Sequence, residues 1–272
     1  MPPADQMPQT FAAPLLGAGD PPPVTVLNEE GGAPLMLLCD HASNAVPGRL
    51  DRLGLPDEVL ERHIAYDIGA AGVTRLLAGR FDAPAILSGF SRLVIDINRA
   101  VDDPTSMPVI SDGVIVPGNR ALPAAEIEAR EAELFRPYHD AVAAHLDRRL
   151  GRGEVPAIVS IHSFTPAMRG FERPWHIGIL WDRDPRMAVP LIEKLREDPR
   201  LVVGDNEPYT ARNSHGETID IHAVPRGLPH VLVEIRQDLI ATPEGEAEWA
   251  ERLAGPLAEI CAEPALFSIE KF

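Results

Sequence analysis

The sequence predicts an α/β fold: a single domain with a mostly parallel sheet flanked by helices. Largely apolar runs, such as those at 35–39, 157–161 and 231–233, are typical of strands buried on both faces of a sheet. Segments with helical periodicity separate these runs, and this alternation predicts parallel strands joined by crossover helices. No internal repeat or break in composition divides residues 25–272, so one domain is expected there.

Charge and composition narrow the class of partner. The chain has 272 residues and a formal net charge of −16, which argues against nucleic acid or an anionic membrane surface as partner. A small anionic substrate stays compatible, because a local group of arginines can override the overall sign. No apolar run approaches the roughly 20 residues of a membrane span, and no signal peptide is recognised. The two cysteines, Cys39 and Cys261, do not form a disulfide framework, which favours a cytoplasmic setting.

The first elements follow an N-terminal arm. Residues 1–24 are rich in proline and predict an extended segment ahead of the domain at 25–272. A short edge strand is expected at 24–27. The first core strand at 34–39 is then followed by a helix whose first turn holds Asp67, where the helix dipole favours an anion.

The middle and end of the chain continue the alternation. We expect strands at 85–87, 92–97, 157–161, 176–181 and 230–235. We expect helices at 123–150, 188–197 and from 243 onward. Pro137 should kink the first of these helices. The long polar segments at 100–120 and 204–226 are expected to form walls around a site.

Polar groups follow three of the apolar runs. His41, His162 and Glu234 lie at the ends of predicted strands, where ligands bind in open α/β sheets. Two imidazoles and one carboxylate are a usual catalytic zinc set, which predicts a metal held by His41, Asp67 and His162. Glu234 is then the candidate general base, since burial would raise its pKa. The same histidines are equally consistent with strand-end packing.

Further residues complete the candidate site. Asn44 is a rival third ligand, but an amide is a poor zinc ligand, so we prefer Asp67 and give Asn44 a hydrogen-bonding role. Arg99 and Arg236 are candidates for holding substrate carboxylates. Arg99 is as compatible with a structural ion pair to a nearby aspartate. Asn98 and Ser163 are candidates for orienting ligands or substrate, or for capping strand ends.

Four segments together resemble the N-formylglutamate amidohydrolase family. They are Cys-Asp-His-Ala-Ser-Asn-Ala-Val-Pro (39–47), Ser-Arg-Leu-Val-Ile-Asp-Ile-Asn-Arg (91–99), Ser-Ile-His-Ser-Phe (160–164) and Val-Glu-Ile-Arg-Gln-Asp-Leu-Ile (233–240). The resemblance implies a phosphorylase/hydrolase-like α/β fold. It also implies metal-dependent hydrolysis of N-formyl-L-glutamate to glutamate and formate in histidine degradation. Family members that degrade histidine typically read Pro-His-Ser-Gly where this chain has Asp40 to Ser43, so the chain resembles a side branch.

The chain is also distantly similar to zinc N-acetylmuramoyl-L-alanine amidases. The similarity implies that His41, Asp67 and His162 hold the metal and that Glu234 acts on the water, with Asp67 standing where those enzymes have a glutamate. The sequence thus predicts a zinc-dependent amidohydrolase acting on a small anionic N-acyl amino acid. The alternatives are a peptidoglycan or peptide amidase with the same chemistry, and a non-catalytic binding protein on this fold.

Overall fold

A seven-stranded sheet in the order β1-β3-β2-β6-β11-β9-β10 forms the centre of the computed structural model, which describes residues 14–212 and 217–272. Its strands are β1 (Val24–Leu27), β2 (Leu35–Cys39), β3 (Ala85–Ser88), β6 (Ala157–Phe164), β9 (Ile177–Leu180), β10 (Val203–Asp205) and β11 (His230–Arg236). Only the β1–β3 and β11–β9 pairs are antiparallel; the other four are parallel. The predicted mostly parallel α/β sheet is confirmed.

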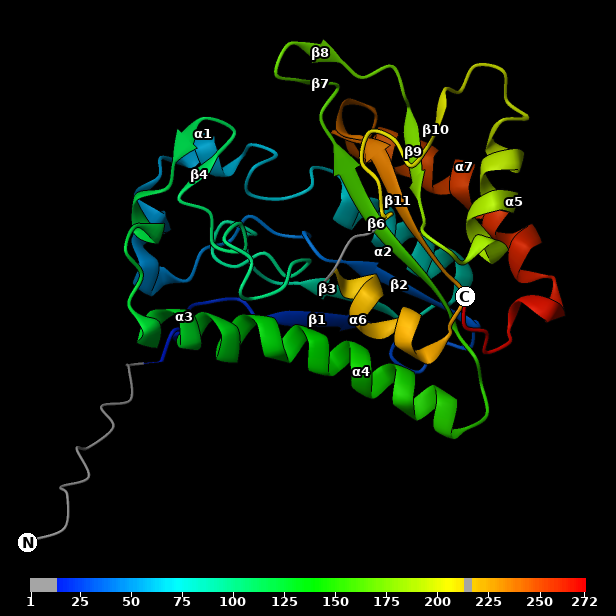
Figure 1. The fold of residues 1–272 in the computed structure, drawn as a ribbon, viewed down its shortest axis with the longest axis horizontal. Coiled ribbons are helices and arrows are strands. Elements are labelled where there is room, and N and C mark those ends of the chain that lie inside the picture. The colour runs from blue at the N-terminus through cyan, green and yellow to red at the C-terminus, as the bar shows by residue number, and fades with distance from the viewer. Residues whose placement is uncertain (1–13, 213–216) are drawn as a thin grey trace, which may run out of the picture.

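Helices cover both faces of this sheet (Figure 1). They are α1 (Asp57–Leu60), α2 (Ala70–Phe81), α3 (Ala124–Arg130), α4 (Arg136–Gly151), α5 (Pro185–Leu195), α6 (Thr218–His222) and α7 (Pro243–Cys261). Short 3₁₀ segments occupy Gly48–Gly54, Pro117–Asn119, Val224–Arg226, Gln237–Leu239 and Pro264–Leu266. Within the described ranges, no helix combines the length and apolar character needed to cross a membrane.

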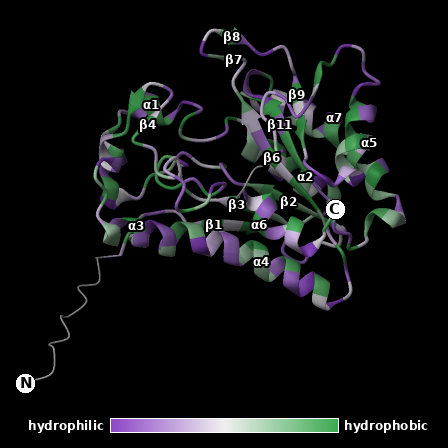
Figure 2. Ribbon diagram, viewed as in Figure 1, coloured by the Kyte–Doolittle hydropathy of each residue, from purple (hydrophilic) through white to green (hydrophobic). Residues whose placement is uncertain are grey.

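Two hydrophobic cores result, one on each face of the sheet. Helices α2, α5 and α7 pack on one face, and α4 and α6 pack on the other. Strand β2 serves both cores, because Leu35 and Leu37 point to the first while Met36 and Leu38 point to the second. Figure 2 shows the contrast between the largely hydrophobic β2 and the mixed hydrophilic and hydrophobic surface of α4.

Two small hairpins belong to the loops around the sheet. One pairs β4 (Ile110–Ser111) with β5 (Val114–Ile115), and the other pairs β7 (Ala167–Met168) with β8 (Phe171–Glu172). The β7–β8 hairpin extends beyond the ends of β6 and β11 (Figure 1). Both hairpins contribute residues to the cavity described below.

Two predicted elements differ from the structure. Residues 92–97 form successive turns instead of a strand, although Leu93 and Val94 are fully buried. The predicted helix 123–150 is divided into α3 and α4 by a π-helical turn at Glu131–Phe135. Pro137 lies immediately after this turn and lacks the N–H that a regular α-helix would need there, which accounts for the irregularity.

The described part of the N-terminal arm, residues 14–23, packs on the domain. The backbone N–H groups of Leu15 and Leu16 donate to the Glu133 carboxylate at 2.7 and 3.0 Å, and Leu15 is fully buried. The carbonyl of Pro23 accepts from the Gly89 N–H just before β1 begins. Residues 1–13 of the predicted arm, and 213–216 of the predicted wall, lie outside the described residues.

Candidate active site

The functional side chains gather at the carboxyl ends of the parallel strands. His41, His162 and Glu234 line a cavity of about 500 Å³ there. The surrounding loops supply most of the rest of its lining, which includes Arg92, Asp96, Asn98, Arg99, Thr105, Asp112, Ser163, Met168, Arg169, Tyr209 and Glu217. Strand order thus brings together residues that are far apart in the sequence.

The register between β6 and β11 places His162 next to Glu234. His162 and Glu234 are directly paired neighbours in the parallel β6–β11 ladder. Strand β6 continues to Phe164, so His162 lies within the strand instead of just beyond it. Because side chains alternate, His162 faces the α4 side of the sheet while Ile161 enters the opposite core. His41 directly follows β2.

Asp67 lies in the loop before α2 and lines the same cavity as His41 and His162. It was expected in the first turn of a helix, but α2 begins only at Ala70, after Gly69 in a left-handed conformation. The Asp67 N–H donates to the His41 carbonyl at 3.0 Å. Asp67 is therefore tied to the end of β2 by a backbone hydrogen bond, and the helix dipole of α2 is not what places it.

The two imidazoles converge on one carboxylate oxygen. Nδ1 of His41 and Nδ1 of His162 lie 3.2 and 2.9 Å from Oδ2 of Asp67. One ligand atom from each of the three residues lies within 4.8 Å of the others, and all three residues are buried. The structure thus brings the predicted metal ligands together. This donor set, two imidazole nitrogens and a carboxylate oxygen, suits zinc or another divalent transition metal.

A buried carboxylate also lies next to the other ring nitrogen, Nε2, of each imidazole. Nε2 of His41 lies 2.7 Å from Oδ1 of Asp96, and Nε2 of His162 lies 3.0 Å from Oδ2 of Asp40. Hydrogen bonds of this kind fix the tautomer and ring orientation of metal-binding histidines. With a proton on each Nε2, both Nδ1 atoms are left facing Asp67.

Asp40 is held in turn by three hydroxyl groups. It accepts hydrogen bonds from Tyr138 Oη at 2.8 Å, Ser160 Oγ at 3.0 Å and Thr218 Oγ1 at 2.7 Å. These donors come from α4, β6 and the start of α6. Asp40 is only 1% exposed, so its orientation, and with it that of His162, is fixed by packing from three elements.

Two arginines balance part of the negative charge. Arg92 donates to Oδ2 of Asp96 through Nε at 3.0 Å and Nη2 at 2.7 Å, and its Nη1 lies 3.5 Å from Asp67. Arg99 pairs with Asp96 at 3.3 Å and more loosely with Asp103 at 3.9 Å. Arg99 thus forms the expected alternative ion pair and also lines the cavity, with its side chain 42% exposed.

Neighbouring charges shift the pKa values of the buried acids and histidines in this cluster. Burial disfavours the charged forms of Asp67 and Asp96, but the facing histidines and Arg92 outweigh it and lower the pKa of both acids. The same contacts outweigh burial at the imidazoles, so Asp96 and Asp67 raise the pKa of His41, while Asp40 and Asp67 raise that of His162. The site is therefore built to hold positive charge between its carboxylates.

Glu234 behaves differently from the other acids. Burial, reinforced by the charge of Asp67, raises its pKa to about 7. Its Oε2 is buried and has no hydrogen-bond partner among the described residues. A carboxyl group that is unpartnered and titrates near neutral pH beside a cavity is suited to proton transfer.

Two predicted substrate-binding residues lie outside the cavity lining. Arg236 pairs with Asp238 at 2.8 Å, and Asn44 donates to the Leu60 carbonyl at 3.0 Å. The structure does not bring Arg236 into the cavity lining beside Glu234, because β11 ends at Arg236 and its guanidinium group pairs with Asp238 in the turn that follows. Asn44 instead holds the loop after β2.

The other two predicted residues do line the cavity. Asn98 accepts from the Thr218 N–H at 2.8 Å, which joins the residue 92–99 segment to α6. Ser163 donates from its hydroxyl group to the Ile68 carbonyl at 2.8 Å, and its N–H lies 3.3 Å from Oδ2 of Asp67. Both residues are thus partly committed to orienting the loops around Asp67 and Asp40.

Sequence reasoning did not assign roles to Asp40 and Arg92, and it considered Asp96 only as one possible ion-pair partner of Arg99. Each stands within a segment that was singled out, next to His41 or close to Arg99 in sequence. Asp40 was visible as a carboxylate immediately after an apolar strand. Arg92 and Asp96 could be found only as an i, i+4 pair, which was obscured by assigning 92–97 to a strand.

The chain is similar to several known proteins. The sequence model of the N-formylglutamate amidohydrolase family matches residues 33–241. The crystal structure of a gene product from Agrobacterium tumefaciens is 38% identical, with a TM-score of 0.88, and the match covers 91% of this chain and 98% of that one. The N-formylglutamate amidohydrolase from Ralstonia eutropha JMP134 shares the fold at 21% identity, with a TM-score of 0.60 over 88% of this chain and 97% of that one. A search of curated proteins gave no match.

Proposed function

Because the chain belongs to the N-formylglutamate amidohydrolase family, an amidohydrolase family, we propose that it hydrolyses the amide bond of N-formyl-L-glutamate or another small N-acyl amino acid, with a divalent metal ion. One observation carries this proposal. Two histidines and an aspartate converge beside Glu234, whose buried carboxyl oxygen has no partner among the described residues.

The residues present fit a metal ion. His41, Asp67 and His162 would hold it through two imidazole nitrogens and a carboxylate, and zinc is the ion that this set favours. Asp40, Asp67, Asp96 and Glu234 are all at least nine-tenths buried, which leaves negative charge that a cation would balance. When bound, such an ion supplies Lewis-acid activation of water and of the amide carbonyl.

Glu234 would carry the proton in this reaction. Its carboxylate takes a proton from the attacking water and then delivers that proton to the nitrogen of the leaving amine. A pKa of about 7 allows both steps at neutral pH, because the carboxyl and carboxylate forms are then close in free energy. The β6–β11 pairing places Glu234 beside His162 at the same cavity.

The arginines would select an anionic substrate. Arg99 lines the cavity with its side chain 42% exposed, and Arg92 also lines the cavity and pairs with Asp96. A carboxylate entering the cavity can accept from Arg99 in the planar geometry that guanidinium groups favour. We infer a small anionic N-acyl amino acid as substrate, no nucleic-acid partner, and the cytoplasm as the setting. Cys39 and Cys261 are both free thiols.

The experiment measures metal content and formate release on the same purified samples. The wild-type protein should hold metal near one equivalent and release formate from N-formyl-L-glutamate. His41→Ala and Asp67→Ala should lose the metal and the activity together. Glu234→Gln should keep the metal and lose activity by about 10²–10⁴-fold, the usual contribution of general acid–base catalysis. Glu263→Gln, at an exposed residue outside the cavity lining, is the matched control and should behave as wild type.

Two results would contradict the proposal. Wild-type protein that takes up no metal after addition of zinc would rule out the metal-dependent mechanism. Metal-loaded protein that hydrolyses none of a panel of N-formyl and N-acetyl amino acids would leave a metal-binding protein without this activity.

A further inference from the structure

Tyr209 places a phenol in the lining of the candidate active-site cavity, which it shares with Glu234 and Asp67. It lies in the loop between β10 and α6, and the residue is 40% exposed. Its hydroxyl oxygen accepts a hydrogen bond from Nη1 of Arg173 at 3.1 Å. Among the described residues, no group accepts a hydrogen bond from this hydroxyl. Because a phenol can accept and donate at once, its proton is available to a molecule in the cavity.

Arg173, which holds this hydroxyl, is a buried cation without a carboxylate partner. The residue is only 7% exposed. Its guanidinium group donates to the carbonyl and hydroxyl oxygens of Thr165 at 3.4 and 3.1 Å. It also lies over the rings of Phe164 and Tyr209, 5.8 and 4.8 Å from their centroids. In the part of the chain that the structure describes it forms no ion pair, so only neutral oxygens and aromatic faces stabilise its charge.

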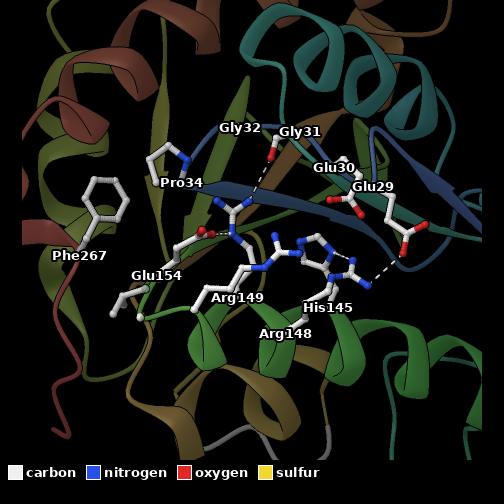
Figure 3. A pocket seen from close by; sticks show the side chains of 13 residues that line it. Glu29, Glu30, Gly31, Gly32, Pro34, His145, Arg148, Arg149, Glu154 and Phe267 are labelled. Carbon is white, nitrogen blue, oxygen red and sulfur yellow. Dashed lines mark hydrogen bonds and ion pairs between the residues drawn. The ribbon is translucent and has the colours of Figure 1, made fainter.

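Arginines in a second cavity of the protein show the more usual arrangement. There, ahead of β2 and β6, Arg148 pairs with Glu29 at 3.1 Å, and Arg149 pairs with Glu154 at 2.9 Å (Figure 3). Burying a cation without such a partner costs free energy. Proteins keep costly arrangements of this kind mainly at functional sites, which directs attention to what the Arg173 charge acts on.

Neighbouring charges shift the pKa of Tyr209 in opposite directions. Burial and the carboxylates of Glu234 and Asp67 raise the pKa of the phenol, whereas Arg173 lowers it. The phenol therefore keeps its proton at neutral pH, and it lies close enough to both acids of the active site to interact with them. A hydroxyl group whose oxygen accepts from a cation is polarised and donates a stronger hydrogen bond.

We propose that Tyr209 is a further catalytic residue, whose hydroxyl group donates a hydrogen bond to the carbonyl oxygen of the scissile amide as that oxygen gains negative charge. This role rests on the amidohydrolase function proposed for the same cavity. The O–H bond of Tyr209 does not break, and the proton transfers stay with Glu234. Arg173 is a positioning residue, because it holds and polarises the phenol without belonging to the cavity lining. A donor that is already in place stabilises the developing charge with little reorganisation.

Steady-state kinetics of the metal-loaded, full-length protein with N-formyl-L-glutamate test this role. Tyr209→Phe removes only the hydroxyl group and should lower kcat by about 10²–10³-fold, the effect of losing one oxyanion donor, while KM stays within about twofold. Metal content and Tm should match those of wild type, because the aromatic ring stays in place. Tyr66→Phe makes the same change at a tyrosine outside the cavity lining and should leave both kinetic constants unchanged.

A double-mutant cycle tests whether Arg173 acts through Tyr209. Arg173→Met should lower kcat by about tenfold in the wild-type background, because the phenol is no longer held and polarised. In the Tyr209→Phe background the same change should lower kcat by no more than about twofold, since the hydroxyl group is already absent. An equal loss in both backgrounds overturns the positioning role and leaves Arg173 as a structural support.

A tetrahedral analogue provides a measurement that does not depend on turnover. N-(methylphosphonyl)-L-glutamate has a tetrahedral phosphorus with charged oxygens where the substrate has its amide carbonyl, so it imitates the transition state. In calorimetric titrations, Tyr209→Phe should bind this analogue about tenfold or more weakly than wild type does. Both proteins should bind L-glutamate, which lacks the acyl oxygen, equally well.

The possible outcomes distinguish this role from the proposed function. Turnover by wild type, with kcat and analogue affinity of Tyr209→Phe within about twofold of it, overturns the role of Tyr209 alone. A raised KM with unchanged kcat also overturns it, because the hydroxyl group would then bind substrate and transition state equally. Wild-type protein that neither hydrolyses an N-acyl amino acid nor binds the analogue overturns both proposals.

Discussion

At the scale of single residues, the acids of the active site differ by their neighbours and not by their burial. Asp67 and Glu234 are both almost fully buried. Asp67 faces two imidazoles and Arg92, and its pKa is lowered, whereas Glu234 has an unpartnered oxygen and its pKa is raised to about 7. This division separates a residue suited to binding a cation from one suited to moving a proton.

The arginines give a direct test of which residues bind substrate. Arg99→Ala should raise KM for N-formyl-L-glutamate by about tenfold or more, because one charged hydrogen-bonding partner is lost. Arg236→Ala should leave KM within about twofold, since Arg236 pairs with Asp238 outside the cavity lining. Steady-state kinetics of both variants provide the comparison. A larger effect at Arg236 than at Arg99 would contradict the assignment.

A buried histidine pair predicts how stability depends on pH. Nε2 of His222 lies 2.9 Å from Nδ1 of His139, and burial, with the nearby His139 and Arg226, lowers the pKa of His222 to about 4. The unfolded chain titrates near 6.5, so it binds more protons than the folded chain between these values. The contribution of His222 is therefore full above pH 6.5 and falls as the pH drops toward 4.

Urea unfolding at pH 7.5 and pH 5 measures this contribution. The wild-type protein should lose up to about 2 kcal/mol more unfolding free energy between the two pH values than the His222→Gln variant does. An equal loss in both proteins would show that His222 titrates normally in the folded state.

The positions of site residues were predictable where polar side chains follow an apolar run. His41 follows β2 closely, and His162 and Glu234 lie near the ends of β6 and β11, because apolar runs reveal approximately where buried strands end. Arg236 and Asn44 were misplaced because their direction depends on how the chain leaves the strand. The sequence holds only weak signals for that direction.

At the scale of elements, Gly69 fixes the loop that carries Asp67. Its φ is +80°, and a Cβ at this position would lie 2.0 Å from the Ile240 carbonyl oxygen. Gly69→Ala should therefore destabilise the protein by about 2–4 kcal/mol and weaken metal binding, since Asp67 would have to move. Equilibrium unfolding and metal titration of the variant provide both measurements.

Gly79, in the helix α2 that follows Gly69, is the matched control. It is exposed in α2, and a Cβ there would meet nothing within 4 Å. Gly79→Ala should stabilise the protein by about 0.5–1 kcal/mol, because alanine favours the helical conformation. Equal effects at the two positions would show that the left-handed turn at Gly69 is not a constraint.

The missed elements have a common cause. The segment at 92–97 is as apolar as a strand because it is buried in the core on the α4 side, yet it forms turns that present Arg92 and Asp96 to the site. Apolar character reports burial, but backbone conformation depends on partners that are remote in the sequence. The π-helical turn before Pro137 is similarly invisible to a helical period, because both halves keep apolar residues facing the core.

At the scale of the whole molecule, the carboxylate-rich end of the sheet predicts stabilisation by metal. A ligand that binds only the folded state stabilises it by about 2.7 kcal/mol at a hundredfold excess over Kd. For a protein of this size, adding zinc to chelator-treated protein should raise Tm by about 5–10 °C. Differential scanning fluorimetry measures the shift.

Two variants test whether this rise in Tm comes from metal bound at Asp67. Asp67→Asn should abolish it, because the carboxylate shared by both imidazoles is removed. Asp182→Asn, an exposed acid paired with Arg183 elsewhere, should leave it intact. A shift that persists in Asp67→Asn would place the metal at another site.

The sheet was more predictable than the loops that surround the site. Alternating strands and helices are sufficient to predict a mostly parallel sheet, because crossover helices leave few other arrangements. The antiparallel pairing of β9 with β11 departs from this pattern, because no helix lies between β6 and β9 to carry the chain back to the other end of the sheet.

The antiparallel direction of β9 affects where the sequence can vary without changing the sheet. Strand β6 ends, and β9 begins, at the same edge of the sheet, so the chain between them stays beside the cavity and contributes Met168 and Arg169 to its rim. Residues can be added to or removed from the β7–β8 hairpin without rewiring the sheet or disturbing either core. This connection is a natural insertion point, and exchanging it between relatives is a route to new substrate preference on an unchanged catalytic frame.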